Sequence, residues 1–223
     1  MLKSIIIDFD NTIGYFTQII YLLNIIEKTF NRKINQADIE LLIDIYPHIL
    51  RPKIINILKI ILDMKSKSII KYFILYTKNK NKTFVNMIIT YLAQKLNYNP
   101  EQLFDFKIFT DTKKSFSSLL NNTNNTICST PKLCIIDDKN YTNQLDNTNF
   151  KIYYIKCDCY KYFYSKYELK KCAIKLKIKQ ILLNKYIDEI YKIKKLKDNL
   201  PVKIHNFNSS YIIKLLTEFC LNA

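Results

Sequence analysis

The sequence is poor in the residues that build soft-metal sites. It contains two histidines, and among its six cysteines only Cys157 and Cys159 form a closely spaced pair. A structural zinc site needs four Cys or His ligands, and only His48 and His205 could supply imidazoles. We therefore expect no zinc at Cys157 and Cys159. Because the cysteines are scattered, we expect reduced thiols rather than a disulfide framework.

Long apolar runs are also absent. No uncharged apolar stretch approaches the roughly 20 residues that a membrane-spanning helix needs. Residues 1–11 hold too short an apolar stretch for a signal peptide. Hydrophobic residues still make up 48% of the 223 residues, which is enough for a sizeable core and excludes wholesale disorder. We expect a soluble intracellular protein, cytoplasmic or nuclear, with no membrane partner.

Acidic residues are scarce beside basic ones. The chain has 19 Asp and Glu against 35 Lys and Arg, so its formal net charge is +16. Such an excess attracts phosphorylated or polyanionic partners. A second explanation stays open: the chain is crowded with Ile, Lys, Asn, Tyr and Phe, has one Gly and no Trp, and AT-rich coding would produce that bias without selection for binding.

Short β-branched and apolar runs alternate with helical patterns as far as about residue 160. Strands are predicted at residues 3–8, 69–76, 104–109, 133–136 and 150–156. Helices are predicted at residues 15–30 and 37–46, at a segment opening on Pro52 with an apolar stripe over 54–62, and at 82–96; the polar stretch 121–131 is predicted to be a loop. This alternation predicts an α/β domain of three layers, Rossmann-like, with a central parallel sheet.

Residues 166–223 follow a different pattern from residues 1–165. Strand signals vanish, lysines gather, and apolar residues recur every three to four positions. We predict a basic, helical C-terminal extension to the core. Lysines such as Lys170, Lys171 and Lys175 could contact a nucleic-acid backbone there, but the solvated face of a packed helix is the favoured explanation.

Three predicted strands end in polar groups that could share one site. The first is followed by Asp8 and Asp10, the second by Thr77, and the fourth by Asp137 and Asp138. Ligands of an open α/β sheet bind beyond the carboxyl ends of its strands. An acidic, all-oxygen site suits Mg²⁺, and a carboxylate there can also act as a nucleophile toward a phosphoryl group.

In chain order these residues resemble the four motifs of haloacid dehalogenase (HAD) superfamily phosphatases. The matches are Asp8-Phe9-Asp10-Asn11-Thr12 after an apolar strand, Thr77 after another, Lys114 with Lys113 as the alternative, and Asp137-Asp138. Each motif alone is weak, but all four occur in order within residues 5–138. The resemblance implies that the α/β domain is a HAD-type core.

The resemblance also implies catalytic roles. Asp8 would be the nucleophile, giving an aspartyl-phosphate, and Asp10 would be the general acid and base. Thr77 would hydrogen-bond the phosphoryl oxygens, and Lys114 would neutralise charge on Asp8 and on the phosphate.

A magnesium site is implied as well. The cofactor would be Mg²⁺. Its ligands would be the carboxylates of Asp8 and Asp137 and the backbone carbonyl of Asp10, with the Asp138 carboxylate as a further candidate. Asn11 is expected to contribute to phosphate binding.

Arg51-Pro52 and the Asp-Asp pair without a preceding glycine look more like one branch of this superfamily. That branch holds the RNA polymerase C-terminal-domain and nuclear-LIM-interactor-type phosphatases. Arg51 itself is expected to pack or cap rather than to bind substrate. Residues 14–50 have room for only two short helices, so the resemblance implies a minimal cap and an open site, which suits a phosphate displayed on a large molecule.

The expected function is that of a Mg²⁺-dependent phosphatase, with a phosphoprotein as the favoured substrate. Two alternatives stay open. One is a nucleotide or polynucleotide-end phosphatase. The other is a catalytically silent basic scaffold that binds nucleic acid or protein.

Overall fold

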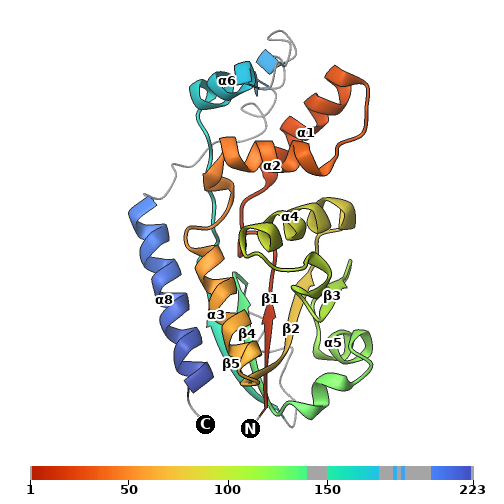
Figure 1. The fold of residues 1–223 in the computed structure, drawn as a ribbon, viewed down its shortest axis with the longest axis vertical. Coiled ribbons are helices and arrows are strands. Elements are labelled where there is room, and N and C mark those ends of the chain that lie inside the picture. Colours follow the sequence, from red (N-terminus) through yellow and green to blue (C-terminus); the bar gives the residue numbers. More distant parts are fainter. Residues whose placement is uncertain (1, 140–149, 176–182, 185–186, 189–201, 222–223) are drawn as a thin grey trace.

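The computed structural model describes residues 2–139, 150–175, 183–184, 187–188 and 202–221. A five-stranded sheet runs through this part of the chain in the order β3-β2-β1-β4-β5, and every neighbouring pair is parallel (Figure 1). The strands are β1 (Lys3–Ile7), β2 (Ile70–Thr77), β3 (Phe106–Phe109), β4 (Lys132–Asp137) and β5 (Lys151–Lys156). The predicted α/β fold with a central parallel sheet is confirmed, and no predicted strand boundary moves by more than two residues.

Helices surround the sheet. They are α1 (Thr17–Phe30), α2 (Gln36–Ile45), α3 (Ile54–Ser66), α4 (Lys82–Lys95), α5 (Phe116–Asn122), α6 (Lys166–Lys175) and α8 (Val202–Leu221), with short 3₁₀ turns η1 (Pro47–Ile49), η2 (Pro100–Gln102) and η3 (Thr126–Ser129). None of the helices in the described ranges combines the length and the apolar character needed to cross a bilayer.

The two faces of the sheet are covered unequally. Alternate residues of β1 point to opposite faces, as in any strand. Ile5 belongs to the larger apolar cluster, formed with α1 to α4 and α8. Ile6 belongs to a smaller cluster, which Leu119 of α5 and Ile127 of η3 cover. The result is a three-layer, Rossmann-like arrangement with one thick and one thin outer layer.

Hydrogen bonds join the amino end of β1 to the carboxyl end of α8. Lys3 is buried, and its ammonium donates to the backbone oxygens of Phe219 and Cys220 at 2.8 and 2.7 Å. These are orphan carbonyls of the last helical turn, which a lysine satisfies well. Tyr153 of β5 also stacks on Phe219 at 5.7 Å between ring centroids. The described parts of the predicted helical extension are helical, and α8 shares the main core.

Part of the C-terminal prediction lies outside the described residues. Lys170 on α6 is exposed. The side chains of Lys171 and Lys175, and residues 189–201, are not among those described. The predicted contacts between these lysines and nucleic acid therefore remain a prediction.

Two local predictions were wrong. Pro52 lies in the turn before α3 rather than in its first helical turn, because Lys53 adopts a left-handed conformation (φ 60°) at the helix N-cap. The stretch 121–131 is not a plain loop: it contains the end of α5 and the turn η3. The hydroxyls of Thr126 and Ser129 bond to backbone oxygens three residues earlier, so this polar segment satisfies its own backbone in short helical turns.

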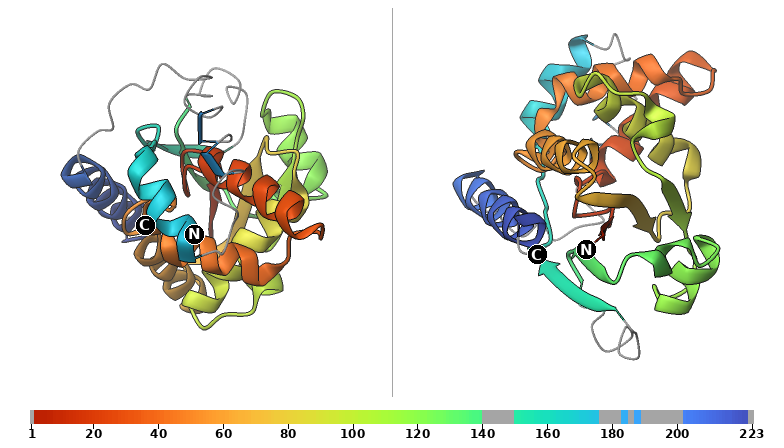
Figure 2. Two further views of the ribbon diagram at one scale, coloured as in Figure 1. Left: turned by 90° about the horizontal axis from the view of Figure 1, so that it is seen from above. Right: turned by 60° about the horizontal axis from the view of Figure 1, so that its bottom comes forward.

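Helices α1 and α2 form the predicted insertion and lie beyond the carboxyl ends of the strands (Figure 1). Figure 2 (left) looks onto this end, with α1, α2 and α6 in front of the sheet. A left-handed Asn31 ends α1, and a reciprocal capping box starts α2: Asn35 accepts from the Asp38 N–H, and Asp38 accepts from the Asn35 N–H. Arg32 adds two bonds to the Asp38 carboxylate at 2.6 and 2.7 Å.

Replacing Asp38 with Asn should lower the free energy of unfolding by about 1 kcal/mol at neutral pH. The bonds from Arg32 hold the pKa of Asp38 below its ordinary 3.8. The contribution of the carboxylate is therefore present above that pH and is lost as the pH falls through the lowered pKa. Urea unfolding of both proteins across acidic pH should show the difference shrinking. The matched control is Asp63→Asn, which removes an exposed pair with Lys67 and should change stability little; an equal effect of both substitutions would contradict this account.

Candidate active site

The carboxylates predicted from the strand ends meet at the carboxyl edge of the sheet. Asp8 follows β1, and its N–H continues the strand pairing by donating to the Ile136 oxygen at 3.0 Å. Asp137 ends the neighbouring strand β4. One carboxylate oxygen from each of Asp8, Asp137 and Asp138 lies within 4.8 Å of the others. In the described part of the chain this is the one group of three or more acidic, Cys or His side chains close enough to share a metal ion.

Lys114 places a positive charge between two of these carboxylates. Its ammonium lies 2.5 Å from Asp8 Oδ1 and 2.6 Å from Asp137 Oδ2. Lys113 is exposed, so Lys114 is the lysine that reaches the site. The residue after Lys114, Ser115, is held by the phenol of Tyr76, which accepts a bond from the Ser115 N–H and donates one to the Ser115 backbone oxygen. This contact fixes the loop from which Lys114 extends.

Burial dominates the electrostatics of the cluster. It raises the pKa of Asp8 to about 7, although Lys114 opposes the shift. It also raises the pKa of Asp137, again against Lys114. Burial alone would lower the pKa of Lys114, but the two carboxylates outweigh it and raise that pKa. The lysine therefore stays charged, while the carboxylates need more positive charge than it provides to remain ionised.

Asp10 lies two residues beyond Asp8 and faces Asn79. The Asn79 amide donates to both carboxylate oxygens of Asp10, at 3.1 and 3.2 Å. Burial raises the pKa of Asp10, and the bonds from Asn79 only partly oppose this. Thr77 at the end of β2 is fully buried, and its hydroxyl accepts from the Asn79 N–H at 3.0 Å. The end of β2 thus orients the second aspartate through Asn79.

The remaining predicted residue, Asn11, lies in the tight bend after the aspartates. It adopts a left-handed conformation (φ 62°), and its N–H bonds to the Gly14 oxygen at 2.8 Å. Its amide donates to the carboxylate of Asp138 at 3.5 Å, the long limit of a hydrogen bond. Asn11 therefore shapes the bend, and its expected phosphate contact stays a prediction.

The single glycine of the chain closes this bend. A Cβ atom at Gly14 would lie 2.5 Å from the Ile49 carbonyl oxygen and 2.7 Å from the Phe16 ring. Backbone oxygen cannot give way at that distance, so any larger residue would push the bend outward. Close packing, rather than an unusual φ angle, requires glycine here.

Arg51 anchors the same bend from behind. The residue is 2% exposed, and its guanidinium donates to the backbone oxygens of Asn11, Thr12 and Asp158 at 2.6–2.7 Å. It also lies over the ring of Tyr160, at 5.4 Å. The structure thus gives Arg51 the packing role expected of it: it joins the loop after β1 to the loop after β5.

The cysteine pair lies near this loop, and within the described ranges it is not part of a group of three or more His, Cys, Asp or Glu residues close enough to share a metal ion. Cys157 is buried, with its sulfur 3.7 Å from the hydroxyl of Thr12, and burial raises its pKa to about 11. The Thr12 hydroxyl is also 3.2 Å from Asp8 Oδ2. A protonated, buried thiol is a packing group.

Sequence reasoning assigned no role to Asn79 and Tyr76. Both belong to the segment that ends the second predicted strand. For Asn79, its place just after that strand was the signal that could have identified it as a site residue. The contact of Tyr76 with Ser115 joins β2 to a residue 39 positions away, and no local pattern announces it. No family model, no curated protein and no solved structure matches this chain.

Replacing Arg51 with Lys should lower the free energy of unfolding by about 2 kcal/mol or more. Lysine keeps the charge but cannot span three carbonyl oxygens, so buried acceptors lose their partners. Chemical denaturation measures the loss. The other arginine of the chain gives a matched control: Arg32→Lys, at a partly exposed pair, should cost less than about 1 kcal/mol. Equal losses would show that the three carbonyl contacts of Arg51 do not matter.

Proposed function

We propose that this protein is a Mg²⁺-dependent phosphatase that hydrolyses a phosphomonoester through an aspartyl-phosphate on Asp8. One observation carries the proposal. Asp8, Lys114 and Asp137, which come from three distant parts of the sequence, contact one another at the carboxyl edge of the sheet, with Asp138 and Asp10 beside them.

The nucleophilic step uses Asp8. A carboxylate oxygen of Asp8 attacks phosphorus, the bond between phosphorus and the ester oxygen breaks, and the phosphoryl group passes to Asp8. Lys114 is placed to balance the charge that spreads over the phosphoryl oxygens. Thr12 and Lys114 each hold one oxygen of Asp8, which fixes the carboxylate for attack.

The proton steps belong to Asp10. Burial raises its pKa, which favours a protonated form that can give its proton to the leaving oxygen. The resulting carboxylate then accepts a proton from water as the water oxygen attacks phosphorus. The bond from phosphorus to Asp8 breaks, phosphate leaves, and both aspartates return to their starting states. Asn79 keeps Asp10 aligned for both transfers.

The donor set fits a hard divalent cation. Asp8, Asp137 and Asp138 offer carboxylate oxygens only, and Mg²⁺ binds in proteins through a few carboxylates together with water and substrate phosphate. When bound, the cation would supply the positive charge that keeps Asp8 ionised despite its burial and would offset charge on the phosphoryl group. A catalytically silent scaffold would gain nothing from burying these charged groups, which costs folding free energy.

Asp8→Asn should reduce the hydrolysis of p-nitrophenyl phosphate to the detection limit, because an amide cannot form the aspartyl-phosphate. Asp10→Asn should slow turnover by about 10²–10⁴-fold and should let phosphorylated protein accumulate, which intact-protein mass spectrometry detects. Asp111→Asn, an exposed carboxylate near the same edge, should keep wild-type activity. Wild-type protein as inactive as Asp8→Asn over a range of pH and metals would refute the proposal.

Magnesium should raise the thermal unfolding midpoint of chelator-treated protein by a few degrees, because a ligand that binds only the folded state stabilises it. In Asp137→Asn this increase should disappear, whatever the variant's stability without metal, while Asp111→Asn should keep it. Differential scanning fluorimetry with and without MgCl₂ measures the increase. A full increase in Asp137→Asn would remove Asp137 from the metal site.

A further inference from the structure

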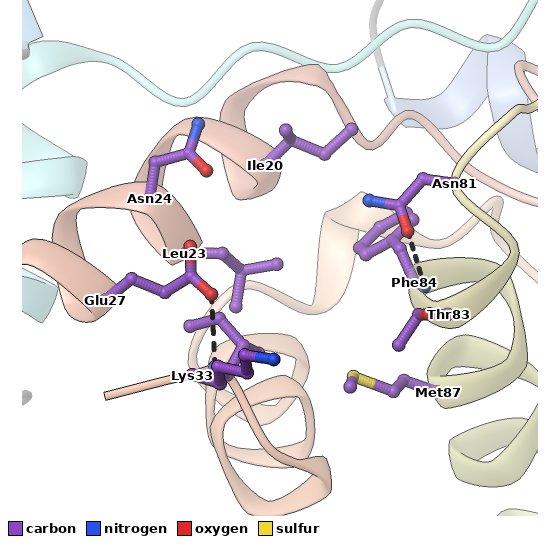
Figure 3. Close-up of a pocket in the computed structure, with 10 residues that line it drawn as sticks. Ile20, Leu23, Asn24, Glu27, Lys33, Asn81, Thr83, Phe84 and Met87 are labelled. Carbon is purple, nitrogen blue, oxygen red and sulfur yellow. Dashed lines mark hydrogen bonds between the residues drawn. The ribbon is translucent and has the colours of Figure 1, made fainter. Parts of the chain in front are cut away.

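A groove lies between α1 and α4, close to the proposed site. It encloses about 290 Å³, and Figure 3 shows side chains of both helices and of the α1–α2 connection pointing into it. Its apolar lining comprises Ile20 and Leu23 of α1, Ile34, and Phe84 and Met87 of α4. The volume exceeds what the side chain of a phosphorylated serine needs, so it can hold a neighbouring group of a larger substrate.

Two contacts connect the groove to the aspartates. The ring of Phe84, which forms part of the groove, packs edge-to-face on Phe9 with 6.4 Å between centroids, and Phe9 stands between Asp8 and Asp10. The N–H of Asn81, another lining residue, donates to the Asn79 side chain at 2.9 Å. Asn79 in turn holds Asp10. The groove is therefore one residue layer from the reacting groups.

The chemistry of the lining favours a peptide side chain. Ile20, Ile34 and Met87 are partly exposed and offer aliphatic or thioether contacts. Phe84, the one aromatic residue among the described lining, is 4% exposed and presents little ring face. Nucleobases bind best by stacking on aromatic faces, whereas an aliphatic side chain needs only apolar contact.

The rim suits a peptide backbone. Asn24, Asn81 and Thr83 are exposed and carry amide or hydroxyl groups, which both donate to and accept from peptide N–H and C=O groups. Lys33 adds a positive charge and Glu27 a negative one, and the Glu27 carboxylate accepts a bond from the Ile34 N–H at 3.3 Å. The net charge of +16 also attracts a phosphorylated, negatively charged peptide.

We infer that this groove binds an apolar side chain located a few residues from the phosphorylated serine or threonine of a peptide substrate. The inference rests on the proposed phosphatase function and adds a substrate class to it. Because an extended chain spans about 3.3 Å per residue, an apolar residue two to five positions away can reach past the first layer of side chains around the phosphate.

The test is a panel of phosphoserine peptides. The parent peptide has alanine at every other position, and each further peptide carries one leucine at two to five positions on either side. At one offset, leucine should raise kcat/KM by about tenfold, as expected for burial of one aliphatic side chain. Asn24→Trp, which fills the groove from α1, should abolish this preference, and Thr83→Trp should do the same from α4.

Matched controls make the outcome decisive. Asn86→Trp, an exposed Asn-to-Trp change on α4 outside the groove lining, should keep the leucine preference. All three variants should hydrolyse p-nitrophenyl phosphate within twofold of wild type and should unfold at similar temperatures, because the replaced side chains are exposed.

Failure of the groove assignment differs from failure of the function. If p-nitrophenyl phosphate is hydrolysed but no leucine offset matters, or if Asn24→Trp and Thr83→Trp keep the preference, the groove does not bind the peptide. The assignment is also overturned if the tryptophans instead impair only the hydrolysis of nucleoside monophosphates. If no hydrolysis depends on Asp8, the proposed function fails and the groove assignment fails with it.

Discussion

The arrangement of acidic side chains at the carboxyl edge of the sheet depends on the Lys114 ammonium, which pairs with both Asp8 and Asp137. Together with Asp138, these carboxylates place oxygens within 4.8 Å of one another, where burial weakens the screening of their repulsion. If all three carboxylates were ionised, they and the ammonium would leave a net charge of −2 on the cluster. The divalent cation that we propose would carry the charge that offsets it.

The backbone produces this convergence in two ways. Parallel pairing of β1 with β4 aligns Ile7 with Ile136, so the residues that follow, Asp8 and Asp137, emerge side by side. The bend after Asp8 is then held by packing. Gly14 permits the close approach of the Ile49 oxygen, and Arg51 fastens the bend to the loop after β5. The chain uses its one glycine and one of its two arginines at this place.

The sequence predicted those features that a local pattern encodes. Asp8 and Asp137 were predicted because each follows a buried apolar run, and parallel strands place such ends together. The choice between Lys113 and Lys114 required the structure, since the two residues share a loop and only one side chain points inward. Tyr76 acts through a contact across the fold, which no local pattern specifies. Asn79 follows a strand end, a position visible in the sequence, but its bond to Asp10 is visible only in the structure. The helical turns of residues 121–131 were missed because a run of Asn, Thr and Ser normally indicates a loop.

The proposed chemistry contacts only the phosphoryl group and the ester oxygen, so it does not by itself select a substrate. Selection must come from surfaces farther along the substrate, and the groove between α1 and α4 is the surface that we propose for it. Phe9 stacks on Phe16 at 4.7 Å and meets Phe84 edge-on. A substrate side chain that contacts Phe84 would therefore affect the position of Phe9, which lies between the two aspartates. Binding energy gained in the groove could then help to position Asp8 and Asp10, which would make selectivity appear in kcat as well as in KM.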